Sequence, residues 1–397
     1  MTNEEVVRRY ESFVVGSYRR DGVIFVRGKG SRLWDSDGKA YLDFFPGWAV
    51  SGLGHCPGPV VAAVRRQAGI LMHVANNFYH PWQAELAERL SKLSFGGKVF
   101  FCNSGGEANE AALKLCRLAG RDRGRYKIIS MENSFHGRTL ATVTMTGQPV
   151  YSAPFAPLPE GFSYVPFNDF AALERAADEK TAAVFLELIQ GEGGINVVDR
   201  GYLEKVVVFC RERGMLIAVD EVQTGFGRTG SLFAFQQFGF IPDIITLAKT
   251  MGGGFPVGAM VARADIADLM VPGTHASTFG GGPLACASSL AVLDMIEKKN
   301  LLARTRRTGA FLQRRLERLK KTFSCIVRVK GMGLMLGLEL DRPGADLVTI
   351  CRNNGLLINC THQTIIRVMP AITVTRREIN DGLAVLEKSI AEFMCKA

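Results

Sequence analysis

Two charged side chains follow apolar segments in the middle of the chain, and both side-chain types can do chemistry. Asp220 ends the run "MLIAVD", and Lys249 comes directly after "DIITLA". A carboxylate or an amine at the end of a buried strand costs free energy unless it is paired or hydrogen-bonded. Taken singly, Asp220 could simply cap a helix, because acidic residues often do, and Lys249 could simply be solvated, as most lysines are. Together they indicate one site, because ligands of open α/β sheets bind outside the carboxyl ends of the strands.

Two further segments stand at the ends of predicted strands. In "FCNSGGEANEA" (101–111), Gly105 and Gly106 precede a predicted helix, whose first N–H groups and dipole favour an anion. "NSFHGRT" (133–139) places an aromatic ring, a histidine and an arginine just after another strand. Glycines before a helix are commonly just a turn, and the chain has neither a GxxxxGK[ST] pattern nor a well-placed GxGxxG.

The joint pattern is more specific than its parts. A phosphate cradle, a carboxylate and a lysine are the groups that pyridoxal 5'-phosphate requires, because the cofactor needs a phosphate anchor, a partner for its pyridine nitrogen and an amine for its Schiff base. The sequence therefore predicts an enzyme that uses pyridoxal phosphate, with Lys249 and Asp220 as catalytic residues. It predicts no metal site.

The segments that position these residues alternate between strand and helix patterns. Apolar runs predict strands, and the amphipathic segments 107–120 and 201–214, each with a glycine stop, predict helices. Buried strands that alternate with helices favour a mostly parallel sheet covered on both faces. The predicted strands are 98–102, 127–131, 181–189, 215–222, 243–248 and 258–262.

The two ends of the chain have a different character. Residues 1–55 contain short alternating strands, and a helical stretch, 284–320, precedes a strand pair joined around Gly331 and a final helix. We therefore expect a large α/β domain over 56–295 and a smaller α+β domain built from 1–55 and 296–397.

Composition narrows the class of protein. The nine cysteines contain no CxxC pair, which favours free thiols in a reducing compartment, and we expect a cytoplasmic protein. The N-terminus has no apolar signal core, and prolines and glycines interrupt the uncharged run 271–293, so neither reads as a membrane segment.

The formal net charge of +10 raises a second class of function, the binding of nucleic acid or of a membrane surface. Much of the excess lies in 301–321, "LLARTRRTGAFLQRRLERLKK". Leu312, Leu316 and Leu319 recur there at helical spacing, which favours the solvated face of an amphipathic helix, and no nucleic-acid motif accompanies it. We expect neither a nucleic-acid nor a membrane partner.

Several motifs, in order, resemble the class III (omega) aminotransferases, and the acetylornithine aminotransferase branch in particular. The resemblance runs from about residue 20 to the C-terminus. It implies an enzyme of arginine biosynthesis with fold type I, a mostly parallel seven-stranded sheet and a homodimer with shared active sites. The motifs are "FFCNSGGEANEAALKL", "NSFHGRT", "ELIQGEGG", "AVDEVQTGFGRTG", "LAKTMGGGFPVGAM" and "STFGGGPLAC".

The resemblance also implies roles for single residues around the cofactor. Lys249 would form the Schiff base, Asp220 would keep the pyridine nitrogen protonated, and Phe135 would stack on the ring. Gln223 would lie near the phenolic oxygen, and Thr278 would reach the phosphate of the neighbouring subunit's cofactor. The full set of implied cofactor contacts is Ser104, Gly105, Gly106, Phe135, Asp220, Glu221, Val222, Gln223, Lys249 and Thr278.

On the substrate side the resemblance implies two arginines. Arg138 would hold the distal carboxylate of the amine donor. Arg367 would be masked by Glu192 while the donor reacts and then bind the α-carboxylate of 2-oxoglutarate, since an arginine–carboxylate contact suits such a clamp. Ser277 would touch the donor.

An acylated diamino acid such as N-acetylornithine is the expected donor. Aminotransferases for 4-aminobutyrate, ornithine or N-succinyl-diaminopimelate, and an aminomutase, remain alternatives, as does the binding of polyanions through 301–321. Some positions depart from the usual pattern of the resemblance. Thr250 stands where glycine is common, Gly106 where alanine or threonine is usual, and Gly282 where asparagine is usual.

Overall fold

A seven-stranded sheet forms the centre of the computed structural model, which describes residues 1–395. The last two residues of the predicted segment 296–397 lie outside that range. The strand order is β4-β12-β11-β10-β7-β5-β6, and all strands run parallel except β12, which is antiparallel to both neighbours. The strands are β4 (Lys98–Cys102), β5 (Lys127–Met131), β6 (Phe162–Val165), β7 (Thr181–Leu186), β10 (Leu216–Asp220), β11 (Ile244–Leu247) and β12 (Gly258–Ala262).

Helices cover both faces of this sheet, as the continuous apolar strands predict. Side chains alternate between the faces of a strand. In β7, Ala183 and Phe185 pack in the cluster that contains the apolar side chains of α4 (Gly105–Gly120), whereas Val184 and Leu186 pack with those of α8 (Arg200–Arg213). A strand that is buried on both faces therefore needs apolar residues at every position.

The ends of these two helices follow their sequence signals. Ser104 is the N-cap of α4, and its side chain accepts a hydrogen bond from the Glu107 N–H. Gly214 ends α8 in the left-handed conformation, with φ +62°, where a glycine meets no steric cost. The first turn of α4 is thereby fixed at the carboxyl end of β4.

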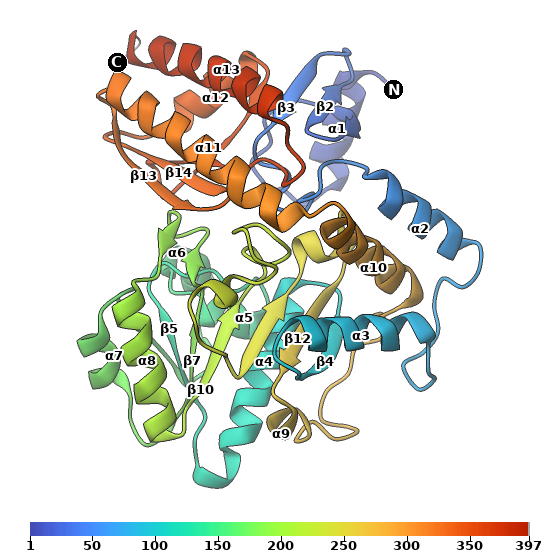
Figure 1. Ribbon diagram of the computed structural model, residues 1–397, viewed down its shortest axis with the longest axis vertical. Helices are drawn as coiled ribbons and strands as arrows, with labels where there is room; N and C mark the ends of the chain where they lie inside the picture. Colours follow the sequence, from blue (N-terminus) through green and yellow to red (C-terminus); the bar gives the residue numbers. More distant parts are fainter. Residues whose placement is uncertain (396–397) are drawn as a thin grey trace.

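The N-terminal and C-terminal segments lie together above the central sheet (Figure 1). A parallel pair of strands joins them directly, because β15 (Leu356–Leu357) pairs with β3 (Ala40–Asp43). The sheet order here is β1-β2-β3-β15, and a second four-stranded sheet has the order β13-β14-β17-β16. The further strands are β1 (Phe25–Lys29), β2 (Arg32–Asp35), β13 (Ile326–Met332), β14 (Met335–Leu340), β16 (Asn359–Thr361) and β17 (Ile365–Val368).

The other helices pack around these sheets (Figure 1). The longer ones are α1 (Asn3–Phe13), α2 (Gly58–Ala68), α3 (Pro81–Leu93), α10 (Pro283–Lys298), α11 (Leu301–Thr322), α12 (Ala345–Asn353) and α13 (Arg376–Cys395). The shorter ones are α5 (Leu140–Met145), α6 (Pro149–Ser152), α7 (Phe170–Ala176) and α9 (Ala264–Ala267). No helix within residues 1–395 is both long and apolar enough to cross a membrane.

Some element predictions were wrong in detail. The stretch 284–320 is two helices, because Asn300 takes φ +48° between them. The predicted strand 181–189 ends at Leu186, and Ile189–Gln190 instead forms β8, which pairs with β9 (Asn196–Val197). The strand pair near Gly331 turns around Gly333.

Gly331 has a different reason to be glycine. It lies inside β13 with φ +107°, and a Cβ there would stand 2.0 Å from the Met335 carbonyl oxygen. The close approach of two backbones therefore explains this glycine, whereas the turn itself falls after Met332, where β13 ends.

The basic helix α11 is amphipathic, as predicted. Leu312, Leu316 and Leu319 are buried. Three of its arginines bond within the protein: Arg304 donates to the carbonyls of Thr373 and Val374, Arg306 to the Gly230 carbonyl and Arg315 to Asn380. Part of the basic charge in this segment therefore joins α11 to neighbouring elements.

Candidate active site

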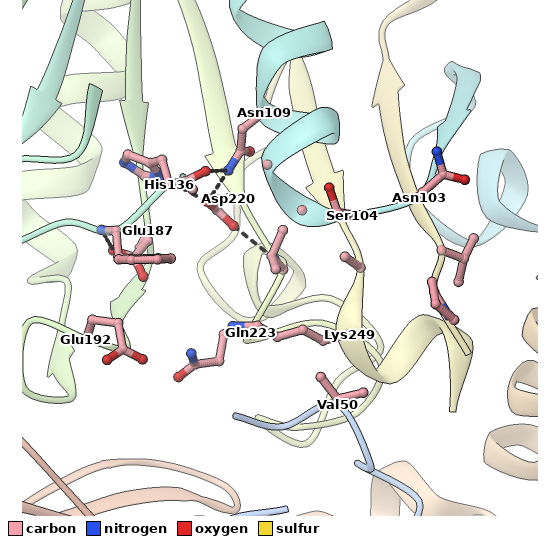
Figure 2. A pocket seen from close by; sticks show the side chains of 18 of the residues that line it. Val50, Asn103, Ser104, Asn109, His136, Glu187, Glu192, Asp220, Gln223 and Lys249 are labelled. Carbon is pink, nitrogen blue, oxygen red and sulfur yellow. Dashed lines mark hydrogen bonds and ion pairs between the residues drawn. The ribbon is translucent and has the colours of Figure 1, made fainter. Parts of the chain in front are cut away.

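A cavity of about 360 Å³ lies at the carboxyl ends of the central strands, where the chemistry was expected. Figure 2 shows Asp220 between Asn109 and His136 on one side of it, and Lys249, Gln223 and Glu192 on the other. The residues that line it include Val50, Asn103, Ser104, Gly105, Gly106, Asn109, Phe135, His136, Glu187, Glu192, Asp220, Val222, Gln223 and Lys249.

Lys249 enters the cavity from a tight turn. β11 ends at Leu247, and Lys249 begins a short 3-10 turn with φ +52°, an unusual backbone conformation for a side chain of this size. Burial lowers the pKa of its amine below the usual value, although the nearby Glu192 and Asp220 carboxylates partly oppose this. The site thereby favours the neutral, nucleophilic form of the amine.

Thr250, the departure beside the lysine, has a defined role in the fold. Its hydroxyl is buried and donates to the Ala49 carbonyl oxygen at 2.6 Å. Its side chain also rests on Gly52, where a Cβ would stand 2.2 Å from the threonine hydroxyl oxygen. Trp48 and Ala49 both have positive φ, so the loop that contains them is strained, and the next residue, Val50, lines the cavity. The Thr250 hydrogen bond therefore holds this strained loop against the residue that follows Lys249.

Asp220 is buried and fully engaged. Its Oδ2 atom accepts from Asn109 Nδ2 at 2.8 Å and lies 2.9 Å from His136 Nδ1, and its Oδ1 atom accepts from the Val222 N–H at 3.0 Å. Three partners from three different segments fix the carboxylate in one orientation. A buried negative charge held in this way can stabilise a positive charge on a group bound in front of it.

The amino end of α4 fits an anion. The Gly105 and Gly106 N–H groups belong to the first turn, which has no earlier carbonyl to bond inside the helix. Gly105 packs so closely on Val222 that a Cβ would stand 2.8 Å from its Cγ1, whereas a Cβ on Gly106 would meet nothing closer than 3.9 Å. Close packing therefore requires glycine at position 105, whereas at position 106 the glycine leaves open space.

Two buried carboxyl groups flank Asp220 in different ways. Glu187 lines the cavity and accepts from the Phe135 and Gly191 N–H groups, and burial, with the Asp220 charge adding, raises its pKa to about 7. Burial also raises the pKa of Glu221 to about 7. The Glu221 carboxylate accepts from Thr224 and from the Phe235 N–H, and it lies outside the set of cavity-lining residues.

Arg367 lies beside the cavity and is 1% exposed. Its Nη1 atom donates to Glu192 at 2.5 Å, so the structure brings together the pair that the sequence suggested. Its Nε and Nη2 atoms donate to Asn359 Oδ1 at 2.8 and 2.5 Å, and its guanidinium lies 4.5 Å from the centre of the Phe45 ring. Each edge of the guanidinium therefore has its own partner.

The other predicted substrate contacts lie nearer the surface. Arg138 is exposed and stacks 4.0 Å from the centre of the Tyr151 ring, with Phe135 at 5.1 Å. Ser277 accepts from the Gly280 N–H and from Asn103, and Thr278 is exposed. None of these three residues lines the cavity.

Comparisons with known proteins agree with this geometry. Residues 16–390 match the family Aminotransferase class-III. The chain belongs to the class III aminotransferases. It is 46% identical to the acetylornithine aminotransferase of Caldanaerobacter subterraneus subsp. tengcongensis, and the alignment covers 96% of this chain and 98% of that protein.

Two solved structures extend the comparison to the fold. The ornithine aminotransferase of Toxoplasma gondii superposes with a TM-score of 0.95 at 34% identity, covering 100% of this chain and 97% of that one. The acetylornithine aminotransferase of Elizabethkingia anophelis gives 0.88 at 32% identity, covering 99% and 100%. The predicted fold type I architecture is thereby confirmed.

As a class III aminotransferase, the protein uses pyridoxal phosphate, and the cavity fits that cofactor. Gln223 Oε1 is buried and has no hydrogen-bond partner among the described residues, which suits a group bound in front of it. The free N–H groups of α4 suit a phosphate, and the fixed Asp220 carboxylate suits a pyridinium nitrogen.

Sequence reasoning did not select Asn109, His136, Glu187 or Asn359. A weak signal existed for Asn109, which is a polar residue on the otherwise apolar buried face of α4. His136 lies within the quoted motif "NSFHGRT", but nothing in the sequence connects it to Asp220. Asn359 is found only from the strand pairing that sets it opposite Arg367.

Proposed function

We propose that the protein transfers the terminal amine of an acylated diamino acid, N-acetylornithine, to 2-oxoglutarate, giving a semialdehyde and glutamate. The observation that carries this proposal is the buried Arg367–Glu192 pair at the cavity, since an arginine with a removable partner suits two substrates whose carboxylates differ in position. The similarity to the acetylornithine aminotransferase of Caldanaerobacter supports the donor and a place in arginine biosynthesis.

In this proposal the residues around the cofactor divide its parts among them. Asp220 would pair with the pyridine nitrogen, Phe135 and Val222 would contact the ring, and Gln223 would bind the phenolic oxygen. The N–H groups of Gly105 and Gly106 and the Ser104 side chain would hold the phosphate. Glu221 is left out of this set, because its carboxylate bonds to Thr224 and Phe235.

Lys249 has two tasks. Its amine would hold the cofactor covalently, and as a free amine it would take up the proton that leaves the substrate carbon. Both tasks need the neutral amine, which its lowered pKa favours. The bound cofactor supplies the electron sink that makes the substrate carbon acidic.

The two arginines serve different carboxylates. Arg138, stacked on Tyr151, holds the distal carboxylate of the donor while Glu192 neutralises Arg367. For 2-oxoglutarate the Glu192 side chain turns away, and Arg367 binds the α-carboxylate next to the reacting carbon. Ser277 assists the donor.

We further propose that two copies assemble with shared sites. Large apolar side chains remain exposed in one region, among them Ile70, Met72, Phe78 and Phe279 at 63–68%. Hydrogen bonds from Asn76 to the Ser277 and Gly280 carbonyls join the two segments of this region. A partner subunit would cover these side chains and receive Thr278 at its cofactor phosphate.

Two broader assignments accompany this proposal. We propose a large domain, 56–295, and a small domain from 1–55 and 296–397, which would contribute Val50 and Arg367 to the cavity and its edge. Nine free cysteines support a reducing, cytoplasmic location.

A donor panel tests the function. Purified enzyme with pyridoxal phosphate and 2-oxoglutarate is given N-acetylornithine, ornithine, 4-aminobutyrate or N-succinyl-diaminopimelate. We expect kcat/KM for N-acetylornithine to exceed that for 4-aminobutyrate by at least about 10-fold, because 4-aminobutyrate lacks the acylamino group and its carboxylate lies one carbon nearer the reacting amine. A preference for 4-aminobutyrate or ornithine would replace the proposed donor.

A further inference from the structure

The short strand β16 touches both members of the Arg367–Glu192 pair. Asn359 lies directly opposite Arg367 in the antiparallel β16–β17 pairing, so the sheet fixes their relative position. Asn359 and Thr361 are two residues apart, and their side chains therefore leave the strand on the same face. One strand thus presents two polar side chains to the pair.

The two contacts act on different parts of the pair. Asn359 Oδ1 accepts from Nε and Nη2 of Arg367, which is the edge of the guanidinium that does not face Glu192. The Thr361 hydroxyl donates to the backbone carbonyl of Glu192 at 2.6 Å. The Thr361 bond therefore holds the Glu192 backbone without engaging its carboxylate.

Burial explains why Arg367 needs a second partner. A buried guanidinium that loses its carboxylate partner is strongly destabilised, because its charge and its N–H groups are no longer compensated. If Glu192 turns away, Asn359 still satisfies the donors at Nε and Nη2. The Nη1 atom keeps only its 3.4 Å contact with the Gly191 carbonyl and can bind an incoming carboxylate in place of Glu192.

The chemical type of residue 359 matters as much as its position. A neutral amide accepts hydrogen bonds without cancelling the positive charge of Arg367. An aspartate at the same place would form a permanent ion pair and leave less charge for the substrate. The neutral acceptor therefore keeps Arg367 both fixed and available.

We propose that Asn359 and Thr361 are positioning residues that hold Arg367 and the Glu192 backbone while the Glu192 carboxylate exchanges with the α-carboxylate of the 2-oxo acid. This inference rests on the proposed function of the pair. It predicts that β16 controls the acceptor half of the reaction and leaves the donor half nearly unchanged.

Single-turnover kinetics on the holoenzyme test this. The donor half-reaction starts with N-acetylornithine, and the acceptor half-reaction starts with the amine-loaded enzyme and 2-oxoglutarate, both followed by the cofactor's absorbance. For Asn359→Asp we expect the half-saturating 2-oxoglutarate concentration to rise about 10–100-fold, with the donor half-reaction within about threefold of wild type. Thr361→Val should raise it by about 3–10-fold, and Thr361→Ser should restore it.

A matched control is Asn380→Asp on α13, where an exposed asparagine likewise accepts from an arginine, Arg315, far from the cavity. It should change neither half-reaction. Equal losses in both half-reactions for Asn359→Asp, or an unchanged response to 2-oxoglutarate, would overturn the role of β16 alone. A wild-type enzyme with no 2-oxoglutarate half-reaction would overturn the proposed function, and this inference with it.

Discussion

The two sides of the cavity are built on opposite principles. Asp220 has three hydrogen-bond partners from three segments and is 5% exposed, so its charge has one position. On the other side, Glu192 and Arg367 face each other with separate supports behind each, and the Glu192 side chain is 16% exposed. One side holds a single charge among fixed partners, and the other holds an ion pair that exchanges partners in the proposed mechanism.

This difference follows the chemistry. The cofactor stays bound through both halves of the reaction, whereas the two substrates take turns. Changes on the fixed side should therefore affect both half-reactions equally, and changes on the exchanging side should separate them. Three substitutions test this contrast, and a fourth tests a buried carboxyl group just outside the cavity.

Lys249→Ala should have the largest effect. Both half-reactions should fall by at least about 10⁴-fold, since the variant loses the covalent link and the proton carrier together. Absorbance spectra should also lose the band of the lysine-bound cofactor. A variant that kept half of the wild-type rate would remove Lys249 from the mechanism.

Asp220→Asn keeps the shape of the side chain and removes its charge. We expect both half-reactions to slow by about 10²–10³-fold, the usual scale for the loss of a preorganised electrostatic contact. Stopped-flow measurement of each half separately is the test. A slower donor half beside a normal acceptor half would contradict the fixed role of this side.

Arg138→Ala should separate the substrates. The donor half-reaction with N-acetylornithine should lose about 10–100-fold in kcat/KM, because a carboxylate contact is lost, while a simple alkylamine donor should change little. Arg125→Ala, which lies before the start of β5 and removes a cation that bonds to the Arg213 carbonyl, serves as a control. If both classes of donor suffer alike, Arg138 does not recognise the carboxylate.

Glu221→Gln should have the smallest effect of the four, and this effect should be on the stability of the fold. In the folded protein the pKa of Glu221 is about 7, above the ordinary 4.5, so folding favours the neutral carboxyl group. The stability that this group contributes is present below pH 4.5 and is lost as the pH rises through 7. At about pH 8 the free energy of unfolding of the variant should exceed that of the wild type by about 1–3 kcal/mol. Near pH 5 the difference should be small.

Denaturant unfolding at the two pH values measures this effect. The matched control is Glu212→Gln, the same substitution at an exposed position on α8. A destabilised Glu221→Gln variant at pH 8 would mean that the ionised carboxylate is needed for its hydrogen bonds to Thr224 and Phe235.

The sequence predicted the parts of the site that lie at strand ends, because a charge after a buried run is a local signal. Lys249 and Asp220 were found this way, and Gly105 through its place before a helix. Glu221 does not line the cavity, whereas Asp220, Val222 and Gln223 do, and no local pattern tells these successive side chains apart. Asn109, His136 and Asn359 depend on contacts between distant segments, and local patterns contain no such information.

The hydrogen bond from Thr250 to Ala49 also bears on how the protein is made. Its two residues are 201 positions apart, and Leu42 bonds to the Gly355 carbonyl even further along the chain. At synthesis rates of about 5–20 residues per second, the N-terminal strands therefore wait roughly 15–60 s for their partners. Chaperones would therefore be needed while the N-terminal segment waits on the ribosome. The active site can form only when synthesis of the chain is almost finished.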